Sequence, residues 1–258
     1  MHSFDRMGRK VHYRLDGPED APVLVLSNSL GTDLRVWDAF LAALPGQWRV
    51  LRLDKPGHGL SDAPAADLTI AELAEDIAAL CDAYGLRDLN FVGLSIGGMI
   101  GQELAATRPD LMRALVLMDT AAKIGTPEMW TTRINAIREN GIVSLEAAIL
   151  ERWFVPAFRK TDQFALWRNM LIRTDDFGYT ACCAAIAAAD LTESTRALTL
   201  PVMAMAGDQD GSTPPDLVRA TAALCNAEFH LIENAGHLPC VEHPKHTAEL
   251  IAAFFNRI

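Results

Sequence analysis

The segment NFVGLSIGGM, residues 90–99, constrains the fold more than any other stretch, because it holds the pattern Gly93-x-Ser95-x-Gly97. Residues 89–92 are an apolar run that predicts a strand, and residues 99–107 predict a helix. A glycine on each side of a serine indicates a sharp, strained turn that exposes the serine hydroxyl. The alternative is a serine that only caps a helix. The order of strand, framed serine and helix favours a nucleophile.

Short β-branched runs alternate with helical stretches along most of the chain. The predicted strands are 11–15, 23–27, 50–53, 89–92, 115–118, 201–206 and 229–232, and the predicted helices include 70–84 and 245–255. Such alternation is typical of an α/β fold in which helices cover both faces of a mostly parallel sheet.

The alternation stops between residues 121 and 196, which are predicted to be helical throughout. This stretch is rich in aromatic residues: Trp130, Trp153, Phe154, Phe158, Phe164 and Trp167. In an open α/β sheet, ligands bind beyond the carboxyl ends of the strands. We therefore expect residues 1–120 and 197–258 to form the core, and residues 121–196 to form an inserted helical cap over the site. Most of the aromatic residues are expected to pack inside the cap.

A serine nucleophile requires a base, because its hydroxyl is scarcely ionised at neutral pH. His237, in the loop before the last helix, is the predicted base, and His58 in PGHG is interpreted as a residue that stabilises its loop. Asp210 is the predicted partner of His237. Asp208 is interpreted as a turn residue, and Asp119 is kept as a substitute acid.

An oxyanion hole uses two backbone N–H groups, one from the residue after the nucleophile and one from an early loop. Ile96 is predicted to supply the first group. Leu30, in the loop after the strand at 23–27, is predicted to supply the second.

The net charge of −10 argues against nucleic acid and anionic membranes as partners, because both attract clustered Lys and Arg. No apolar stretch reaches the length of a membrane span, and the first residues lack a secretory signal. The five cysteines show no C-x-x-C spacing, so neither zinc nor structural disulfides are predicted. We expect a soluble cytoplasmic protein.

Five segments carry a resemblance to a known family: SNSLGTDLRVW, DKPGHGLSD, FVGLSIGGMIGQ, GDQD and AGHLPCVEHP. Together they resemble the α/β-hydrolase superfamily, and in particular the 3-oxoadipate enol-lactonases of aromatic-compound degradation. Asn28-Ser29 stands where most relatives carry His-Gly, which resembles the lactonase branch, as does the run Cys-Cys-Ala-Ala-Ile in the cap. Pro56 departs from the pattern, because relatives often have arginine there.

The resemblance implies Ser95 as nucleophile, His237 as general base and acid, and Asp210 as its orienting partner, with no cofactor and no metal. It implies hydrolysis of 3-oxoadipate enol-lactone to 3-oxoadipate in the β-ketoadipate pathway. A carboxylesterase or a carbon–carbon hydrolase acting on another small acyl substrate uses the same residues and stays an alternative. A non-catalytic ligand receptor on the same fold is a further alternative.

The implied lactone carries an ionised acetate arm, so an acidic protein needs a local cation to hold it. Arg35 and Arg133 are the candidates, because a guanidinium can bind a carboxylate through two hydrogen bonds. Trp130, one helical turn from Arg133, is predicted to pack against the flat ring of the substrate. Each of the three also has a plain structural interpretation, as a surface arginine or as part of the cap interior.

Overall fold

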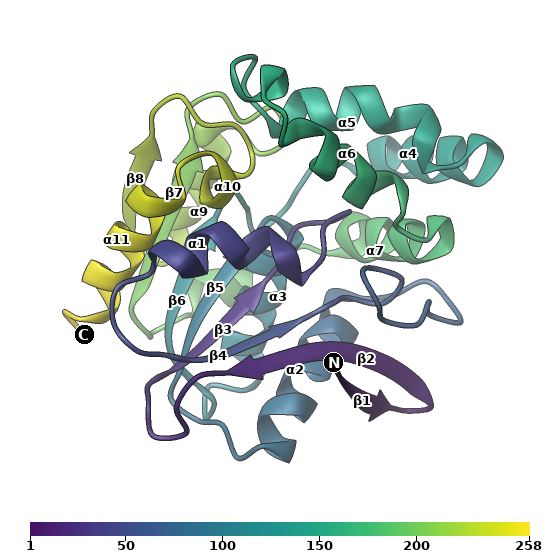
Figure 1. Cartoon of the computed structure of the whole chain (residues 1–258). Helices are drawn as coiled ribbons and strands as arrows, with labels where there is room; N and C mark the ends of the chain where they lie inside the picture. The colour runs from purple at the N-terminus through teal and green to yellow at the C-terminus, as the bar shows by residue number, and fades with distance from the viewer.

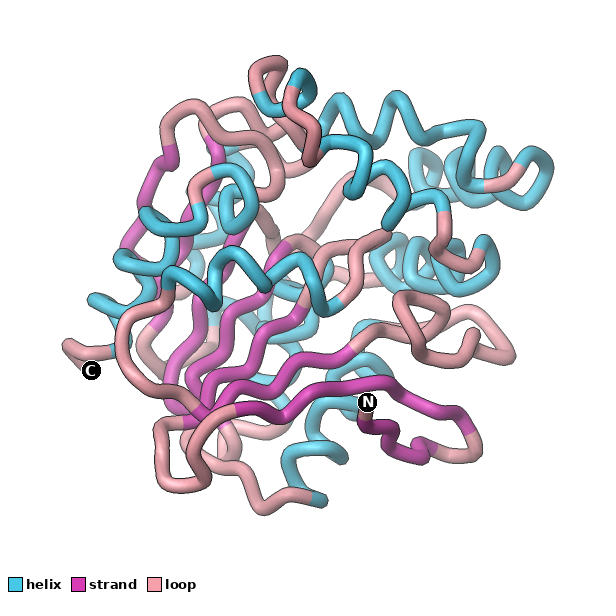
Figure 2. The backbone as a smooth tube through the Cα atoms, in the orientation of Figure 1, coloured by secondary structure: helices cyan, strands magenta, loops and turns pink.

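The computed structural model describes all 258 residues and contains one sheet of eight strands in the order β1-β2-β4-β3-β5-β6-β7-β8. The strands are β1 (His2–Arg6), β2 (Arg9–Asp16), β3 (Val23–Ser27), β4 (Arg49–Leu53), β5 (Leu89–Leu94), β6 (Met112–Met118), β7 (Val202–Gly207) and β8 (Glu228–Ile232). β2 pairs antiparallel with β1 and β4, and all other neighbours are parallel. Figure 2 shows the strands as one twisted sheet.

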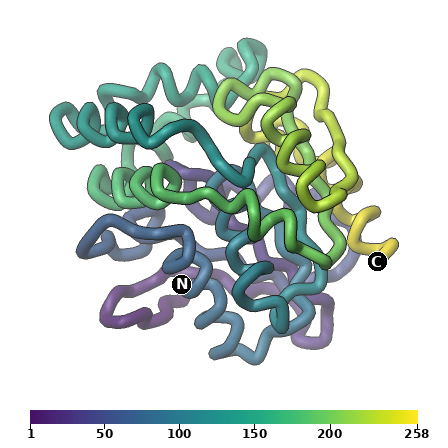
Figure 3. Tube along the Cα trace, turned by 180° about the vertical axis from the view of Figure 1, so that it is seen from behind, coloured from purple at the N-terminus to yellow at the C-terminus, as the bar shows by residue number.

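Helices cover both faces of the sheet, which confirms the predicted fold class. Helices α1 (Asp38–Ala43) and α11 (Pro244–Phe255) pack together on one face (Figure 1). Helices α2 (Ile70–Ala83), α3 (Ile96–Thr107), α8 (Thr192–Arg196) and α9 (Pro215–Leu224) lie on the other face (Figure 3). The central strand β5 is buried along its whole length, as expected for a parallel strand covered on both sides.

Four helices lie over the carboxyl ends of the parallel strands (Figures 1 and 3). They are α4 (Pro127–Asn140), α5 (Glu146–Trp153), α6 (Phe164–Ile172) and α7 (Asp176–Ala188), joined in part by short 3-10 turns at Ile142–Leu145 and Phe158–Lys160. Phe154 stacks on Phe158 with ring centroids 4.5 Å apart, and it also contacts Phe164 and Trp167. These four aromatic residues therefore pack against one another rather than around a ligand.

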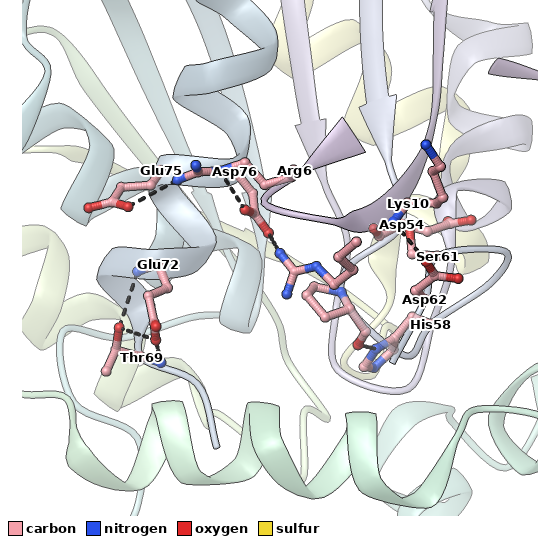
Figure 4. Close-up of polar contacts among 12 residues, drawn as sticks. Arg6, Lys10, Asp54, His58, Ser61, Asp62, Thr69, Glu72, Glu75 and Asp76 are labelled. Carbon is pink, nitrogen blue, oxygen red and sulfur yellow. Dashed lines mark hydrogen bonds and ion pairs between the residues drawn. The ribbon is translucent and has the colours of Figure 1, made fainter. Parts of the chain in front are cut away.

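Four strands or α-helices were not predicted: β1, α1, α9 and α10 (Pro239–Glu242). β1 reads HSFDR and has no fully buried residue, so it carries no apolar alternation from which a strand is recognised. β1 is stabilised by contacts with residues that are distant in the sequence, among them a hydrogen bond from Arg6 Nε to Asp76 in α2 (Figure 4). α2 begins as predicted, where the Thr69 hydroxyl and the Glu72 carboxylate form a capping box.

The helix predicted from residue 99 begins three positions earlier, at Ile96, directly after the serine. All five cysteines are buried and unpaired. No helix combines the length and the apolar character that crossing a bilayer requires.

Candidate active site

Ser95 stands on a sharp turn between β5 and α3. Its backbone has φ 58° and ψ −121°, a region that strains any residue with a side chain. A Cβ atom on Gly93 would lie 2.3 Å from the carbonyl oxygen of Gly97, and one on Gly97 would lie 2.2 Å from that of Ser27. Both glycines are therefore required by the close approach of neighbouring backbone.

His237 lies in the loop after β8, and its Nδ1 is 2.8 Å from Oδ2 of Asp210, with both side chains buried. The other oxygen of Asp210 accepts hydrogen bonds from the backbone N–H groups of Ser212 (2.6 Å) and Thr213 (3.1 Å). Burial opposes ionisation of Asp210, but the charge of His237 and these hydrogen bonds lower its pKa below the ordinary value. The pair is an ionised carboxylate that orients an imidazole.

Asp119, at the end of β6, is a second buried carboxyl group in this region. Its Oδ1 accepts a hydrogen bond from the N–H of Gly207 at 2.8 Å, and its Oδ2 has no partner. Burial, followed by the negative charge of Asp210, raises the pKa of Asp119 well above the ordinary value. Asp119, Asp210 and His237 bring their ligand atoms within 4.8 Å of one another. A metal requires deprotonated ligands, and the raised pKa of Asp119 and the hydrogen bond between His237 and Asp210 both oppose binding of a cation here.

A cavity of about 420 Å³ opens between the strand ends and the overlying helices. Leu30, Ser95 and His237 line it from the sheet side, and Trp130 and Arg133 line it from α4. The predicted nucleophile, base and cation thus line the same cavity.

The free nitrogen of His237, Nε2, is 3.5 Å from the hydroxyl of Ser29, and no hydrogen bond joins it to Ser95. Such hydrogen bonds often tighten only when a substrate is bound. The backbone N–H of Leu30 donates to no other protein atom. Ile96 begins α3, where the first N–H groups have no partner within the helix.

Two arginines are among the residues that line the cavity, and the guanidinium group of neither forms an ion pair with a carboxylate. That of Arg133 lies 4.9 Å from the ring centroid of Trp130, whose indole N–H donates to the carbonyl oxygen of Ile124 at 2.7 Å. The second is Arg152, in the last turn of α5. Sequence reasoning missed Arg152, although it directly precedes the cavity residue Trp153.

The position of Arg35 contradicts its predicted contact with substrate. Its guanidinium forms hydrogen bonds with both carboxylate oxygens of Asp33, and most of its side chain is exposed. Arg35 lines a different cavity, of about 460 Å³, which lies beside Asp54 and does not include Ser95. The carboxylate two residues away holds Arg35 at the outer surface of its loop.

Asp208 holds a turn, as interpreted from the sequence: its Oδ1 accepts a hydrogen bond from the N–H of Ala235 at 3.1 Å. This bond joins the loop after β7 to the loop that carries His237.

Comparison with known proteins adds three findings. A family model described as alpha/beta hydrolase fold matches residues 22–140. The chain is 32% identical over 254 residues to 3-oxoadipate enol-lactonase 2 of Acinetobacter baylyi, covering 95% of this chain and 94% of that protein. It is 33% identical over 258 residues to 3-oxoadipate enol-lactonase 1 of the same organism, covering 98% and 96%.

The crystal structure of the enol-lactonase from Burkholderia xenovorans LB400 superposes with a TM-score of 0.95 at 36% identity, covering 99% of this chain and 100% of that one. These relatives are hydrolases, and they match this chain from end to end. The chain belongs to the α/β-hydrolase family and is a hydrolase of that fold.

Proposed function

We propose that the protein is a serine hydrolase that opens 3-oxoadipate enol-lactone to 3-oxoadipate in aromatic-compound degradation. One observation carries the chemistry: the strained turn at Ser95 faces the same cavity as His237, whose other nitrogen is bound by the carboxylate of Asp210. The similarity to enol-lactonases over the full chain supports the choice of substrate.

His237 Nε2 accepts the proton of Ser95 as the serine Oγ attacks the carbonyl carbon of the lactone. The N–H groups of Leu30 and Ile96 donate to the oxyanion that forms. The ring C–O bond then breaks, and His237 returns its proton to the enol oxygen, which relaxes to a ketone. Water, deprotonated by His237, hydrolyses the resulting acyl-Ser95. Asp210 keeps the imidazole in the required tautomer and stabilises its charged form.

The acetate arm of the lactone needs a cation inside a protein whose net charge is −10. Arg133 supplies it from α4, and Arg152 supplies a second positive charge from α5. Both guanidinium groups are free to bind a carboxylate, because neither forms an ion pair within the protein. The Trp130 ring packs against the guanidinium group of Arg133. We therefore propose that Trp130 mainly positions Arg133 and contacts the substrate less.

A carboxylesterase or a carbon–carbon hydrolase uses the same nucleophile, base and acid. The two unpaired arginines favour a carboxylate-bearing substrate over a neutral ester. A non-catalytic receptor would bind its ligand with little or no turnover. Comparing turnover of the enol-lactone with that of a neutral chromogenic ester separates these functions.

The replacement Ser95→Ala tests the covalent mechanism. We expect kcat on the enol-lactone to fall by at least about a thousandfold, because the nucleophile is lost. The fold should persist, since one hydroxyl is removed at a turn that the glycines already accommodate. Circular dichroism and thermal unfolding check the fold. Retention of more than about a tenth of wild-type turnover would contradict an acyl-enzyme at Ser95.

A further inference from the structure

Lys55, in the loop that follows β4, is a buried cation without a carboxylate partner. Its side chain is covered by the loop after β3, and its Nζ donates to the carbonyl oxygens of Asn28 at 3.0 Å and Ser29 at 2.9 Å. Burying an ammonium group with only neutral acceptors costs free energy. Methionine or leucine would fill such a place at lower cost, so the charge itself requires an explanation.

The carbonyl groups that Lys55 binds belong to the peptide units of the predicted oxyanion loop. Ser29 C=O and Leu30 N–H are the two ends of one trans peptide unit, and they point in opposite directions. The Ser29 oxygen also accepts hydrogen bonds from the N–H (3.2 Å) and the hydroxyl (2.9 Å) of Thr32. These donors fix the plane of the peptide, which leaves the Leu30 N–H unpartnered on the other side, where Leu30 lines the cavity.

We propose that Lys55 is a positioning residue of the oxyanion hole, whose ammonium group holds and polarises the Ser29–Leu30 peptide from the side away from the substrate. A positive charge at the carbonyl oxygen makes the N–H of the same peptide a stronger donor, because hydrogen bonds in a chain reinforce one another. The inference rests on the proposed function, in which an oxyanion forms beside Ser95.

Lys55 is the cation that contacts the carbonyl groups of Asn28 and Ser29, and the histidine nearest to it on the same loop carries no charge. His58 is buried on the same loop, accepts a hydrogen bond from Gly31 N–H (3.0 Å) at Nε2, and is 2.9 Å from the carbonyl oxygen of Pro56 through Nδ1. Burial, and then the charge of Lys55, lowers the pKa of His58 to about 3, so this histidine is neutral. Its hydrogen bonds confirm the interpretation of His58 as a loop-stabilising residue, and Figure 4 shows it inside the loop that carries Lys55.

The groups that face the ammonium are few. Asp54 lies on its own loop, Asp33 lies on the loop after β3, and the thiol of Cys182 lies on α7. Burial lowers the pKa of Lys55 to about 8, and these three groups oppose that shift. The positive charge is therefore present at neutral pH and is lost in the mildly alkaline range.

The replacement Lys55→Met tests the proposal, because methionine fills the space and donates nothing. With a neutral p-nitrophenyl ester at pH 7, we expect kcat to fall by at least about tenfold while KM changes by less than about threefold. The rate of phosphonylation of Ser95 by a p-nitrophenyl phosphonate, which also develops an oxyanion, should fall by a similar factor. Unchanged kcat in the folded variant would overturn the proposal.

Arg52→Met is the matched control. Arg52 is also a buried cation beneath the same loop, but it donates to the carbonyl oxygen of Leu34 at 3.1 Å and pairs with Asp38. We expect it to lower the melting temperature and to leave kcat of the folded protein within about twofold. An equal loss of kcat in both variants would show that any buried cation near the loop matters, and would also overturn the specific proposal.

If Lys55→Met does not fold, the pH dependence of kcat in the wild-type protein provides a second test of the proposal. We expect kcat on the neutral ester to decline above about pH 8, as the ammonium loses its proton and its polarising charge. A flat profile from pH 7 to pH 10 would overturn the proposal. Ser95→Ala separates the two hypotheses: if it stays active, the proposed function fails, whereas if it is inactive and Lys55 is dispensable, only the role of Lys55 fails.

Discussion

Two arginines that look alike in the sequence differ in what surrounds their guanidinium groups. Arg133 lies over the Trp130 ring inside the cavity and has no carboxylate beside it. Arg35 is held by both oxygens of Asp33 and lies outside the cavity. A guanidinium that is already paired with a carboxylate binds a second carboxylate weakly, so of these two arginines we expect Arg133 to bind the substrate arm.

Arg133→Ala should therefore raise KM for the enol-lactone by at least about tenfold and leave hydrolysis of a neutral ester almost unchanged. The neutral ester is the reference because it loses no ionic partner. Arg35→Ala is the control variant, with both substrates expected to behave as in wild type. Steady-state kinetics at fixed ionic strength measures the difference. If Arg133→Ala affects charged and neutral substrates alike, the anion is bound elsewhere, and Arg152→Ala becomes the variant to compare.

At the scale of elements, the helices over the site are attached to the sheet on two sides. On one side, the N–H of His237 donates to the carbonyl oxygen of Trp153 at 2.9 Å, and Glu242 accepts from Val155 N–H at 2.9 Å. On the other side, α7 meets the loop after β4, where Gly178 and Gly57 pack backbone against backbone. The loop that carries the base is thus bonded directly to the element that roofs the cavity.

Gly178→Ala is predicted to destabilise the protein even though alanine favours a helix by about 1 kcal/mol over glycine. The added Cβ would lie 2.5 Å from the Cα of Gly57, which is backbone and cannot rotate away. We expect a net loss of about 1–3 kcal/mol in the free energy of unfolding, measured by denaturant titration. A variant more stable than wild type would show that α7 is free to shift away from the loop.

At the scale of the whole molecule, the interior is continuous from the sheet into the overlying helices. One cluster of 72 buried apolar residues includes Leu24 of β3, Trp153 of α5 and Cys182 of α7. The division into a core of residues 1–120 and 197–258 and a cap of residues 121–196 stays a prediction. Within that range, α8 packs against α3 and α9 rather than over the cavity.

The reactivity of the five buried thiols can be used to follow the unfolding of the sheet and of the overlying helices. Burial raises the pKa of Cys81 in α2 to about 12 and that of Cys182 in α7 to about 11, so both resist thiol reagents in the native state. Because the interior is shared, we expect both to become reactive at the same denaturant concentration, as measured by pulse labelling and peptide mass spectrometry. Labelling of Cys182 at a lower concentration than Cys81 would indicate that α7 opens independently.

The sequence by itself determined the features that depend on neighbours in the chain. The framed serine and the alternation of strands and helices are local patterns, and they predicted the α/β fold and the turn at Ser95. Asp210 and His237 were predicted from loops that follow parallel strands, since such loops all meet at one edge of the sheet.

Only the tertiary structure decided which charged groups meet the cavity. Nothing in the sequences around Arg35, Arg133 and Arg152 shows which of them lines the cavity. In the structure, Arg35 is paired with Asp33 outside it, whereas Arg133 and Arg152 line it. β1 went unrecognised for a related reason, because its polar residues are held by β2 and α2 rather than by a pattern of their own. Lys55 has the ordinary appearance of a loop lysine until the fold brings the Asn28 and Ser29 carbonyl groups, more than twenty residues away in the chain, over its ammonium group. Electrostatic partners are chosen by distance in space, and that distance exists only once the chain has folded.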